Sequence, residues 1–464
     1  MAAARPNDLL LGFYGDDFTG STDAMEGLTR AGLRTVLFIG RPRIEQLCQY
    51  QGLRAIGLAG CSRSLPPREM EVELGEAFGA LKQLNLPIMH YKICSTFDSS
   101  PQIGSIGRAL DVGARIFDAP VVPLLVGAPI LGRYSVFGNL FARSGLDSEP
   151  YRLDRHPTMS RHPITPMTES DLRLHLARQT HRKIGLLDIL SLADAEQARA
   201  KYRELVAGGA EVILLDILYR EHEPVIGNLL WDQVREGSTL FIVGSSGVEY
   251  ALTGYWKSRG LLPASPPLSA PAVEALIAIS GSCSPVTDRQ IGWALQQGAA
   301  EIRLETADLV DPATAEAAIE ASVAEALKLH ERGRTVICHS ARGPADPRLQ
   351  ETVRRFEAMG RDARHHSGRV LGEALGTILL RVLERGKIKR VVIIGGDTSF
   401  FVARTLNIEA LEMVAPTAPG CPLCRAYVPG SVLNGMEICF KGGQVGKDDF
   451  FGTVLVPSRS NVEA

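Results

Sequence analysis

The stretch that decides the fold is residues 9–32, LLLGFYGDDFTGSTDAMEGLTRAG, near the start of the chain. Leu9–Tyr14 is a compact apolar run, which is typical of a buried strand. Residues 15–20, GDDFTG, are expected to form a turn, and Ser21–Ala31 has the apolar spacing of an amphipathic helix that ends at Gly32. The stretch therefore predicts a strand, a turn and a helix, the repeating unit of a parallel α/β sheet.

The same alternation continues through the chain. Val370–Leu383 has the spacing of an amphipathic helix, and the prolines of residues 261–271, LLPASPPLSAP, mark a linker. We predict an α/β protein of two domains, residues 1–262 and 272–464, each a largely parallel sheet flanked by helices, with an interdomain cleft. Further strands are expected at Arg34–Ile39, Pro87–Ile93, Val212–Leu215, Leu240–Val243, Ala275–Ile279, Thr335–Cys338 and Arg390–Ile394.

The composition is that of an ordinary globular protein, with 45% hydrophobic and 22% charged residues among 464. A net charge of −2 gives no electrostatic reason to expect nucleic acid or a membrane as partner. No apolar run approaches the ~20 residues that span a bilayer, and the N-terminus lacks a secretory pattern. Eight scattered cysteines favour reduced thiols, so a cytoplasmic location is expected. Cys421 and Cys424 have C-x-x-C spacing but no second ligand pair, and are expected to be ordinary thiols.

Asp16 and Asp17 directly follow a predicted buried strand. Ligands of parallel α/β sheets gather beyond the carboxyl ends of the strands, and adjacent carboxylates there are costly unless they are solvated, paired or functional. A kinase needs one carboxylate to orient or deprotonate the attacking hydroxyl group, and others can hold Mg²⁺ partly through water. The alternative is that Asp17 or Thr19 merely caps the turn and the helix.

Two more polar loops lie in the first half of the chain. Lys92 with Ser95, Thr96 and Asp98 follows a predicted strand, and a lysine beside hydroxyl groups suits a hydroxylated ligand that carries a carboxylate. The alternative is a capped turn with a solvated lysine. Residues 161–167, RHPITPM, contain Arg161 and His162 on a path fixed by two prolines, where a structural role for the histidine remains the alternative.

Glycine-rich loops follow the predicted strands of the second half. Residues 395–399, GGDTS, come after a β-branched strand, and a helix is expected to begin near Phe400. Glycines let backbone N–H groups approach phosphate oxygens, and the hydroxyl groups add donors. Residues 441–446, KGGQVG, and 281–284, GSCS, have a similar composition, although none of these loops is a Walker-type P-loop. The alternatives are a plain strand–turn–helix connection and a hairpin turn.

Taken together, these phrases resemble the four-carbon acid sugar kinase family over most of the chain. The phrases that carry the resemblance are residues 15–23, 92–99, 162–167, 280–284 with Thr287 and Gln290, 395–399, 419–422 and 441–446. The resemblance implies an N-terminal domain that binds an acid sugar such as threonate, erythronate or a 3-oxo-tetronate. It also implies a C-terminal domain that binds ATP, with transfer of the γ-phosphoryl group to a terminal hydroxyl group in the presence of Mg²⁺.

Pattern and resemblance together give a set of candidate site residues, with Asp17 as the first choice of base and Asp16 as the second. Metal ligands are not assigned. The candidates for substrate binding are Lys92, Ser95, Thr96, Asp98, Arg161 and His162. The candidates for nucleotide binding are Ser282, Gly368, Gly395, Gly396, Asp397, Thr398, Gly442 and Gly443.

The chain departs from the family pattern in two places. It has extra sequence between Gly127 and Arg161, and residues 441–446 read KGGQVG where the family commonly has KSGNFG. Both departures leave the substrate open, so a kinase of a larger or branched sugar acid and a non-catalytic sugar-acid and nucleotide sensor remain alternatives. A dinucleotide-dependent enzyme lacks a well-placed G-x-G-x-x-G turn, and a homodimer remains open as the assembly.

Overall fold

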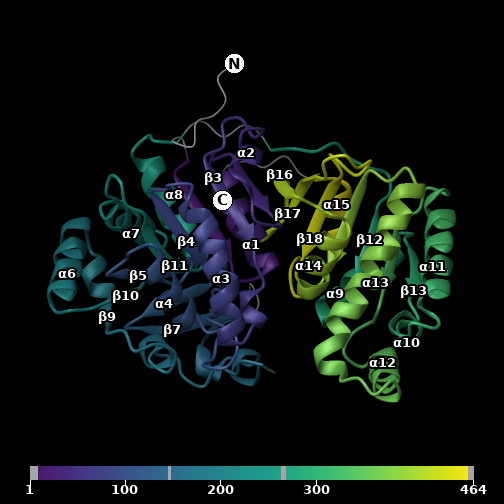
Figure 1. Cartoon of the computed structure of the whole chain (residues 1–464), viewed down its shortest axis with the longest axis horizontal. Helices are drawn as coiled ribbons and strands as arrows, with labels where there is room; N and C mark the ends of the chain where they lie inside the picture. The colour runs from purple at the N-terminus through teal and green to yellow at the C-terminus, as the bar shows by residue number, and fades with distance from the viewer. Residues whose placement is uncertain (1–8, 145–147, 163, 263–267, 458–464) are drawn as a thin grey trace. The chain divides into compact units, whose positions relative to one another are not determined.

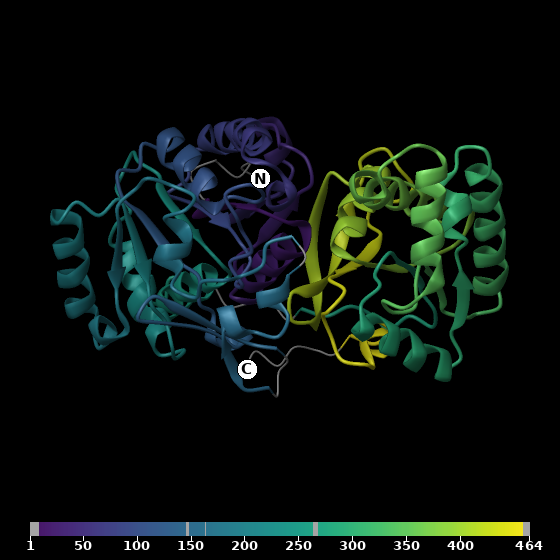
Figure 2. The same cartoon turned by 90° about the horizontal axis from the view of Figure 1, so that it is seen from below.

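The computed structural model describes residues 9–144, 148–162, 164–262 and 268–457. The chain divides into two compact units, Met1–Ser265 and Pro266–Ala464. In each unit, helices flank a mostly parallel sheet, as Figures 1 and 2 show in two views. This confirms the predicted α/β class.

The sheet of the first unit is entirely parallel between neighbouring strands. Its strands are apolar and mostly buried, as expected for a parallel sheet that is covered on both faces. Their order is β2 (Thr35–Phe38), β3 (Ala55–Ala59), β1 (Leu11–Gly15), β4 (Ile88–Lys92), β11 (Leu240–Gly244), β5 (Val122–Leu125), β10 (Val212–Leu215) and β9 (Ile184–Leu187).

Two layers of helices cover this sheet. Helices α1 (Phe18–Arg30), α8 (Gly247–Ser258), α7 (His222–Trp231) and α6 (Ala195–Ala207) pack one against the next. Helix α3 (Pro67–Lys82) packs against α4 (Ile106–Ile116), and both contact central strands. Under α3 the ring of Phe78 meets the rings of Tyr14, Tyr91 and Phe241 with centroids 5.6–5.9 Å apart, which fixes this layer on the sheet.

The segment between Gly127 and Arg161, which was predicted to be an insertion and is called the insertion below, forms a small antiparallel sheet of its own. It consists of β6 (Arg133–Val136), β7 (Asn139–Arg143) and β8 (Pro150–Arg152). Two isolated bridges join it to the loops around it, Ser135 to Ile217 and Asn139 to Asp171. The described residues of this segment therefore pack as an ordered part of the first unit.

The second unit has the strand order β13 (Ala300–Arg303), β14 (Val336–His339), β12 (Ile277–Ser280), β15 (Arg390–Ile394), β18 (Glu437–Lys441), β17 (Cys421–Tyr427) and β16 (Ala410–Ala418). The first five are parallel, and β17 is antiparallel to both of its neighbours. Helix α13 (Ala363–Arg385) packs between α11 (Ala315–His330) and α14 (Gly396–Thr405), as Figure 1 shows. Helix α15 (Phe450–Leu455) packs against α9 (Pro285–Gln296).

Helices α1, α13 and α14 begin earlier than predicted, and the starts of α1 and α14 lie at candidate site loops. Helix α13 begins at Ala363 rather than Val370. Helix α1 begins at Phe18 rather than Ser21, because the Asp17 side chain caps it by accepting a 2.9 Å hydrogen bond from the Gly20 N–H. Helix α14 begins at Gly396 rather than near Phe400. Gly395 has φ +120°, a conformation that few other residues adopt, and it lets the chain turn directly from β15 into the helix.

In the part of the chain that the structure describes, none of the eight cysteines forms a disulfide bond. The Cys421 sulfur lies 3.4 Å from that of Cys439 on the neighbouring strand. Among the described residues, no helix is long and apolar enough to cross a bilayer.

Candidate active site

Three strand ends of the first unit lie side by side and bring its polar loops together. Gly15 at the end of β1 and Gly244 at the end of β11 are both register partners of Lys92, the last residue of β4. The Asp16 N–H donates a 2.8 Å hydrogen bond to the Lys92 carbonyl oxygen. The predicted acidic loop and the predicted lysine loop therefore start at one point of the sheet edge.

Both carboxylate oxygens of Asp17 are occupied. Oδ1 accepts the hydrogen bond from the Gly20 N–H. Oδ2 accepts a 2.8 Å hydrogen bond from the Thr19 hydroxyl group and forms an ion pair with Arg63. Burial pushes the pKa of Asp17 up, but Arg63 and these hydrogen bonds outweigh it and hold the pKa below its usual value. Asp17 is thus a charged, fixed group that both caps α1 and orients Arg63.

Asp16 has the opposite environment. Its side chain is buried, and its Oδ1 has no hydrogen-bond partner among the described residues. Burial raises the pKa of Asp16 to about 7, against the attraction of Arg63 and Lys92 and with the help of the Asp17 charge. A carboxyl group that titrates near neutral pH and has a free oxygen suits a proton acceptor.

Lys92 is buried and already has a carboxylate partner. Its Nζ lies 3.6 Å from Asp23 Oδ2 and donates a 3.1 Å hydrogen bond to the Ile93 carbonyl oxygen. Burial lowers the pKa of Lys92, but Asp23 and the buried Glu249 outweigh it, so the pKa is raised and the ammonium group stays charged. The same Glu249 is also in contact with a buried histidine, since its Oε1 lies 2.7 Å from His90 Nδ1.

The loop after β4 carries the predicted hydroxyl groups. The Thr96 hydroxyl group donates a 2.6 Å hydrogen bond to Asp98 Oδ1, while Asp98 Oδ2 lies 3.8 Å from Arg63. Between them the buried Phe97 has φ +57°, which sharpens the turn. Ser95, next to Thr96, is partly exposed.

Arg63 is the residue of this cluster that sequence reasoning missed. It lies in the 3₁₀ turn η2 (Ser62–Ser64), just beyond β3, and its N–H donates 3.0 Å to the Asp16 carbonyl oxygen. The sequence does contain a pattern that indicates this loop, since the apolar run Ala55–Ala59, typical of a buried strand, ends directly before it. Arg63 was missed because no strand was predicted there.

Arg161 and His162 are not joined to this cluster. His162 Nδ1 accepts a 3.1 Å hydrogen bond from the Thr165 N–H, and Arg161 is exposed. In the described ranges, no hydrogen bond or ion pair links either residue to Asp16, Lys92 or Asp98. Pro163 lies outside the described residues, and substrate binding by this loop stays a prediction.

In the second unit three more strand ends lie side by side. Ile394 is the register partner of both Ser280 and Lys441, so the glycines that follow these three residues start at the same edge. Two of the glycine positions have no room for a side chain. A Cβ on Gly281 would come 2.1 Å from Thr398 Oγ1, and one on Gly443 would come 2.6 Å from Ser282 Oγ.

Polar contacts hold the last glycine loop against α9. The Thr287 hydroxyl group donates 2.9 Å to the Gly443 carbonyl oxygen, and Gln290 Nε2 donates 3.0 Å to that of Val445. Lys441 is buried and donates 2.9 Å to the Gly442 carbonyl oxygen. Burial lowers the pKa of Lys441 to about 8, so this ammonium group is held where its charge is only partly compensated.

The structure shows fewer contacts for the remaining candidates for nucleotide binding. Gly396 opens α14 and is exposed, with nothing within 4 Å of a Cβ added there. Asp397 lies in the first turn of α14, but its side chain is outside the described part of the structure. Gly368 is an exposed residue of α13, the helix that packs against α14.

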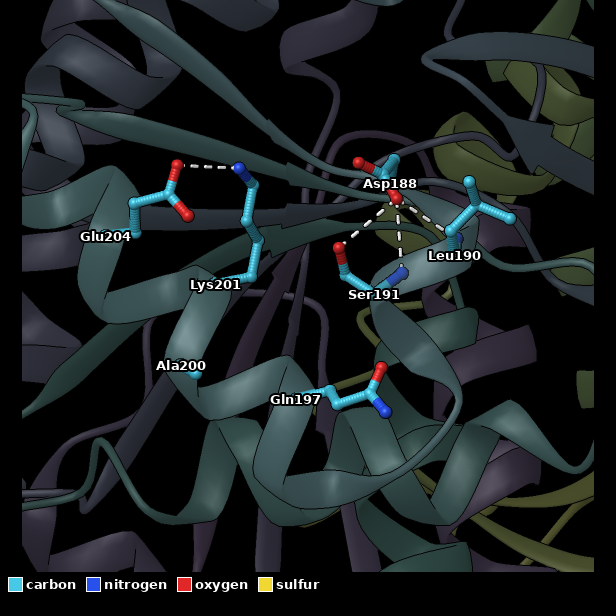
Figure 3. A pocket seen from close by; sticks show the side chains of 7 residues that line it. All are labelled: Asp188, Leu190, Ser191, Gln197, Ala200, Lys201 and Glu204. Atoms are coloured by element: carbon cyan, nitrogen blue, oxygen red, sulfur yellow. Dashed lines mark hydrogen bonds and ion pairs between the residues drawn. The ribbon is translucent and has the colours of Figure 1, made fainter.

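A surface pocket at the edge of the first unit is unrelated to these loops (Figure 3). It lies between η6 (Ile189–Leu192) and α6, and its polar groups bond to one another. Asp188 Oδ1 accepts from the N–H groups of Leu190 and Ser191, and Lys201 pairs with Glu204 at 2.8 Å. None of the candidate site residues lines this pocket, which has the contacts of a capped turn beside a helix.

The chain matches two domain families and several characterised relatives. Residues 11–252 match a sugar-binding N-terminal domain, and residues 277–451 match a nucleotide-binding C-terminal domain. A 3-oxo-isoapionate kinase of Paraburkholderia graminis is 48% identical, over 98% of this chain and 95% of the relative. A 3-oxo-tetronate kinase of Pseudomonas savastanoi pv. phaseolicola is 30% identical, over 97% of each chain. The crystal structure of a Salmonella typhimurium LT2 protein is 26% identical with a TM-score of 0.77, over 95% of this chain and 97% of that one.

Two α/β units with these sequence matches define an ATP-dependent sugar-acid kinase. The chain belongs to the four-carbon acid sugar kinase family.

Proposed function

We propose that this kinase phosphorylates a hydroxyl group of 3-oxo-isoapionate, with the linear 3-oxo-tetronate as the second candidate substrate. The higher identity to the 3-oxo-isoapionate kinase, 48% against 30% over nearly the whole chain, supports this order. Isoapionate has a branched carbon skeleton. A branched sugar acid was one of the alternative substrates that the sequence left open.

Asp16 is proposed as the general base, and the proposed mechanism depends on this assignment. Its pKa of about 7 and its unpartnered Oδ1 suit removal of a proton from the attacking hydroxyl group. Asp17, the first choice from sequence, has both oxygens engaged, so it is better suited to holding Arg63 beside Asp16. Lys92, Thr96 and Asp98 are proposed to bind the polyhydroxylated part of the substrate.

The glycine loops of the second unit are proposed to bind the phosphates of ATP. Support comes from the close approaches at Gly281 and Gly443, where the backbone packs against the Thr398 and Ser282 hydroxyl groups with no room for a side chain between them. Lys441, at the start of the last loop, adds a positive charge to this edge of the sheet.

Mg²⁺ is proposed to arrive with ATP. The described residues contain no group of three or more His, Cys, Asp and Glu side chains that could hold a metal ion. Mg²⁺ usually keeps several waters and binds through substrate phosphates with one or two carboxylates, so it does not need such a group. When bound, it would neutralise charge on the phosphates, while positioning and charge stabilisation by the protein lower the barrier.

A direct assay tests the proposal. The purified enzyme is incubated with ATP, MgCl₂ and either 3-oxo-isoapionate or 3-oxo-tetronate, and the products are followed by mass spectrometry. We expect a phosphorylated acid in both reactions, with the higher kcat/KM for 3-oxo-isoapionate. A higher kcat/KM for 3-oxo-tetronate would reverse the order of substrates. Tight binding of both acids and ATP without any product would instead favour the non-catalytic sensor.

A further inference from the structure

Arg133 is a cation of the first unit that the site described above does not use. It begins β6 in the insertion, and one of its terminal nitrogens donates to three backbone carbonyl oxygens. The distances from Nη1 are 2.8 Å to Leu131, 3.3 Å to Gly132 and 3.2 Å to Arg143. These bonds fix the guanidinium plane at the start of the insertion.

A second nitrogen of the guanidinium group, Nε, is buried and lacks a hydrogen-bond partner among the described residues. Arg133 is partly buried, and no carboxylate of the described residues forms an ion pair with it, which leaves its charge uncompensated by the protein. Burial accordingly lowers the pKa of Arg133, even though Asp98 and Cys94 attract its charge.

Arg133 pairs with Ala128, just beyond β5, and Leu125 at the end of β5 and Lys92 at the end of β4 are both register partners of Gly244. Arg133 therefore lies at the same sheet edge as the loop that follows β4.

The other two cations at that loop already have carboxylate partners. Lys92 lies 3.6 Å from Asp23, and Arg63 pairs with Asp17 and lies 3.8 Å from Asp98. A sugar acid brings one additional negative charge. Of the three cations, Arg133 is the one whose charge is not matched by a described carboxylate, and a guanidinium group has the fork geometry of donors that suits a carboxylate.

The insertion is bonded to the rest of the first unit at two places. At one, the Leu140 N–H donates a 3.0 Å hydrogen bond to the Ser170 carbonyl oxygen and the Leu172 N–H donates 2.9 Å to that of Gly138.

At the other place, a buried carboxylate at the end of β10 holds the insertion. Asp216 Oδ1 accepts hydrogen bonds from the Ser135 hydroxyl group at 2.8 Å and from the Gly138 N–H at 3.0 Å. Its Oδ2 accepts a 3.2 Å hydrogen bond from the Ile189 N–H. Ser135 and Ile217 also exchange two backbone hydrogen bonds of 2.9 Å. Arg133 is therefore carried on a rigid element and not on a free loop.

We propose that Arg133 binds the carboxylate of the substrate and thereby selects sugar acids over neutral sugars. This rests on the proposed function, because it assigns one group of the same substrate to one residue. A purely structural alternative exists, in which Arg133 only clamps the turn before β6 through Nη1. That alternative explains the three carbonyl contacts, but it does not explain why Nε has no hydrogen-bond partner and the positive charge no carboxylate partner among the described residues.

The test compares an acid with its neutral counterpart. In erythrulose a hydroxymethyl group replaces the carboxylate of 3-oxo-tetronate, and the ketone and the remaining hydroxyl groups are kept. Arg133→Gln should raise the KM for 3-oxo-tetronate roughly ten- to hundredfold, the range for a hydrogen bond to a charged group, without changing the KM for ATP or the kcat/KM for erythrulose. Arg133→Lys should fall between Arg133→Gln and the wild type. Arg155→Gln is the matched control, because Arg155 lies in the same insertion but its side chain is 77% exposed.

Two outcomes would overturn the proposal. An unchanged KM for 3-oxo-tetronate in Arg133→Gln would mean that Arg133 does not contact the carboxylate. An equal loss for 3-oxo-tetronate and erythrulose would assign Arg133 to the structural alternative. If the wild type phosphorylates no sugar acid, the proposed function fails, and calorimetry with 3-oxo-tetronate alone decides about Arg133. Weaker binding to Arg133→Gln than to the wild type supports the proposal, and equal or absent binding to both contradicts it.

Discussion

The backbone N–H of Asp16 donates a 2.8 Å hydrogen bond to the carbonyl oxygen of Lys92, across two neighbouring parallel strands. The acidic loop and the lysine loop are thus held together by main-chain contacts of the sheet and not by side chains that could rotate away. Substitutions of individual side chains at this edge should therefore change charge and proton transfer without moving the loops.

The first prediction concerns the pH dependence of turnover. As the proposed base, Asp16 must be deprotonated, so kcat/KM of the wild type should rise with pH through about 7. Arg63 lowers the pKa of Asp16, so Arg63→Gln should move this rise to higher pH, by about 1 pH unit or more. Arg63→Lys keeps the charge and should shift it less. A pH profile that does not move in Arg63→Gln would contradict the assignment of Asp16.

The second prediction concerns stability. The pKa of Asp16 is about 7 in the folded protein and near 3.8 in an unfolded chain, so between these values the folded state binds the extra proton. Wild-type stability should then fall as the pH rises from about 4 to about 7, because the buried carboxylate becomes charged. Asp16→Asn should remove this loss, and its stability relative to the wild type should improve with pH.

Denaturant unfolding at pH 4 and pH 8 measures this difference. Asp118→Asn is the control, because Asp118 is exposed and has φ +54°, a conformation that asparagine tolerates well. A relative stability of Asp16→Asn that is the same at both pH values would show that Asp16 is already charged at pH 4.

The third prediction tests the close approach in the second unit. Gly281→Ala would place a Cβ 2.1 Å from Thr398 Oγ1, so one of the two loops must move. We expect the KM for ATP to rise at least about tenfold while the KM for the sugar acid changes little. Gly292→Ala, on the helix that follows, meets its nearest atom at an ordinary 3.7 Å and should leave both KM values unchanged. Equal behaviour of the two alanine variants would argue against phosphate binding at this loop.

The fourth prediction concerns the anchor of the insertion. Asp216→Ala leaves the Ser135 hydroxyl group and the N–H groups of Gly138 and Ile189 without their acceptor, at a cost of roughly 1–3 kcal/mol for a buried unsatisfied group. We expect faster proteolysis within β6–β8 and a higher KM for the sugar acid. Asp188→Ala removes another acceptor of backbone N–H groups from a nearby turn without touching the insertion, so it should lower stability but not change that KM.

Short buried strands were the most predictable part of the fold. Val212–Leu215 and Arg390–Ile394 lie where their β-branched and apolar runs predicted them, because both faces of such strands are covered. The starts of α1 and α14 were not predicted correctly. They depend on one capping side chain, Asp17, and on the positive φ of Gly395, which residue patterns express weakly.

The candidate site was partly predictable for the same reason. Lys92 ends a strand that the sequence indicated, and Asp16, Gly281, Gly395 and Gly442 follow such strands. Parallel pairing brings these positions to one edge within each unit's own sheet. Arg63 and Arg133 were missed, since one follows an unpredicted strand and the other belongs to an insertion whose folding depends on a distant carboxylate. Opposite pKa shifts in the adjacent Asp16 and Asp17 also cannot be read from sequence, because they arise from burial and from Arg63.

The attachment of β6–β8 has a consequence for how this enzyme could change its preference. The small sheet is bonded to the end of β10 through Asp216 and a pair of main-chain bonds, and to residues 170–172 through two more main-chain bonds. Its three strands form a separate sheet. It could be exchanged between homologous kinases as a cassette while the strand register that sets Asp16 and Lys92 is preserved. Swapping this segment alone is thus a practical route to engineering which acids the enzyme accepts.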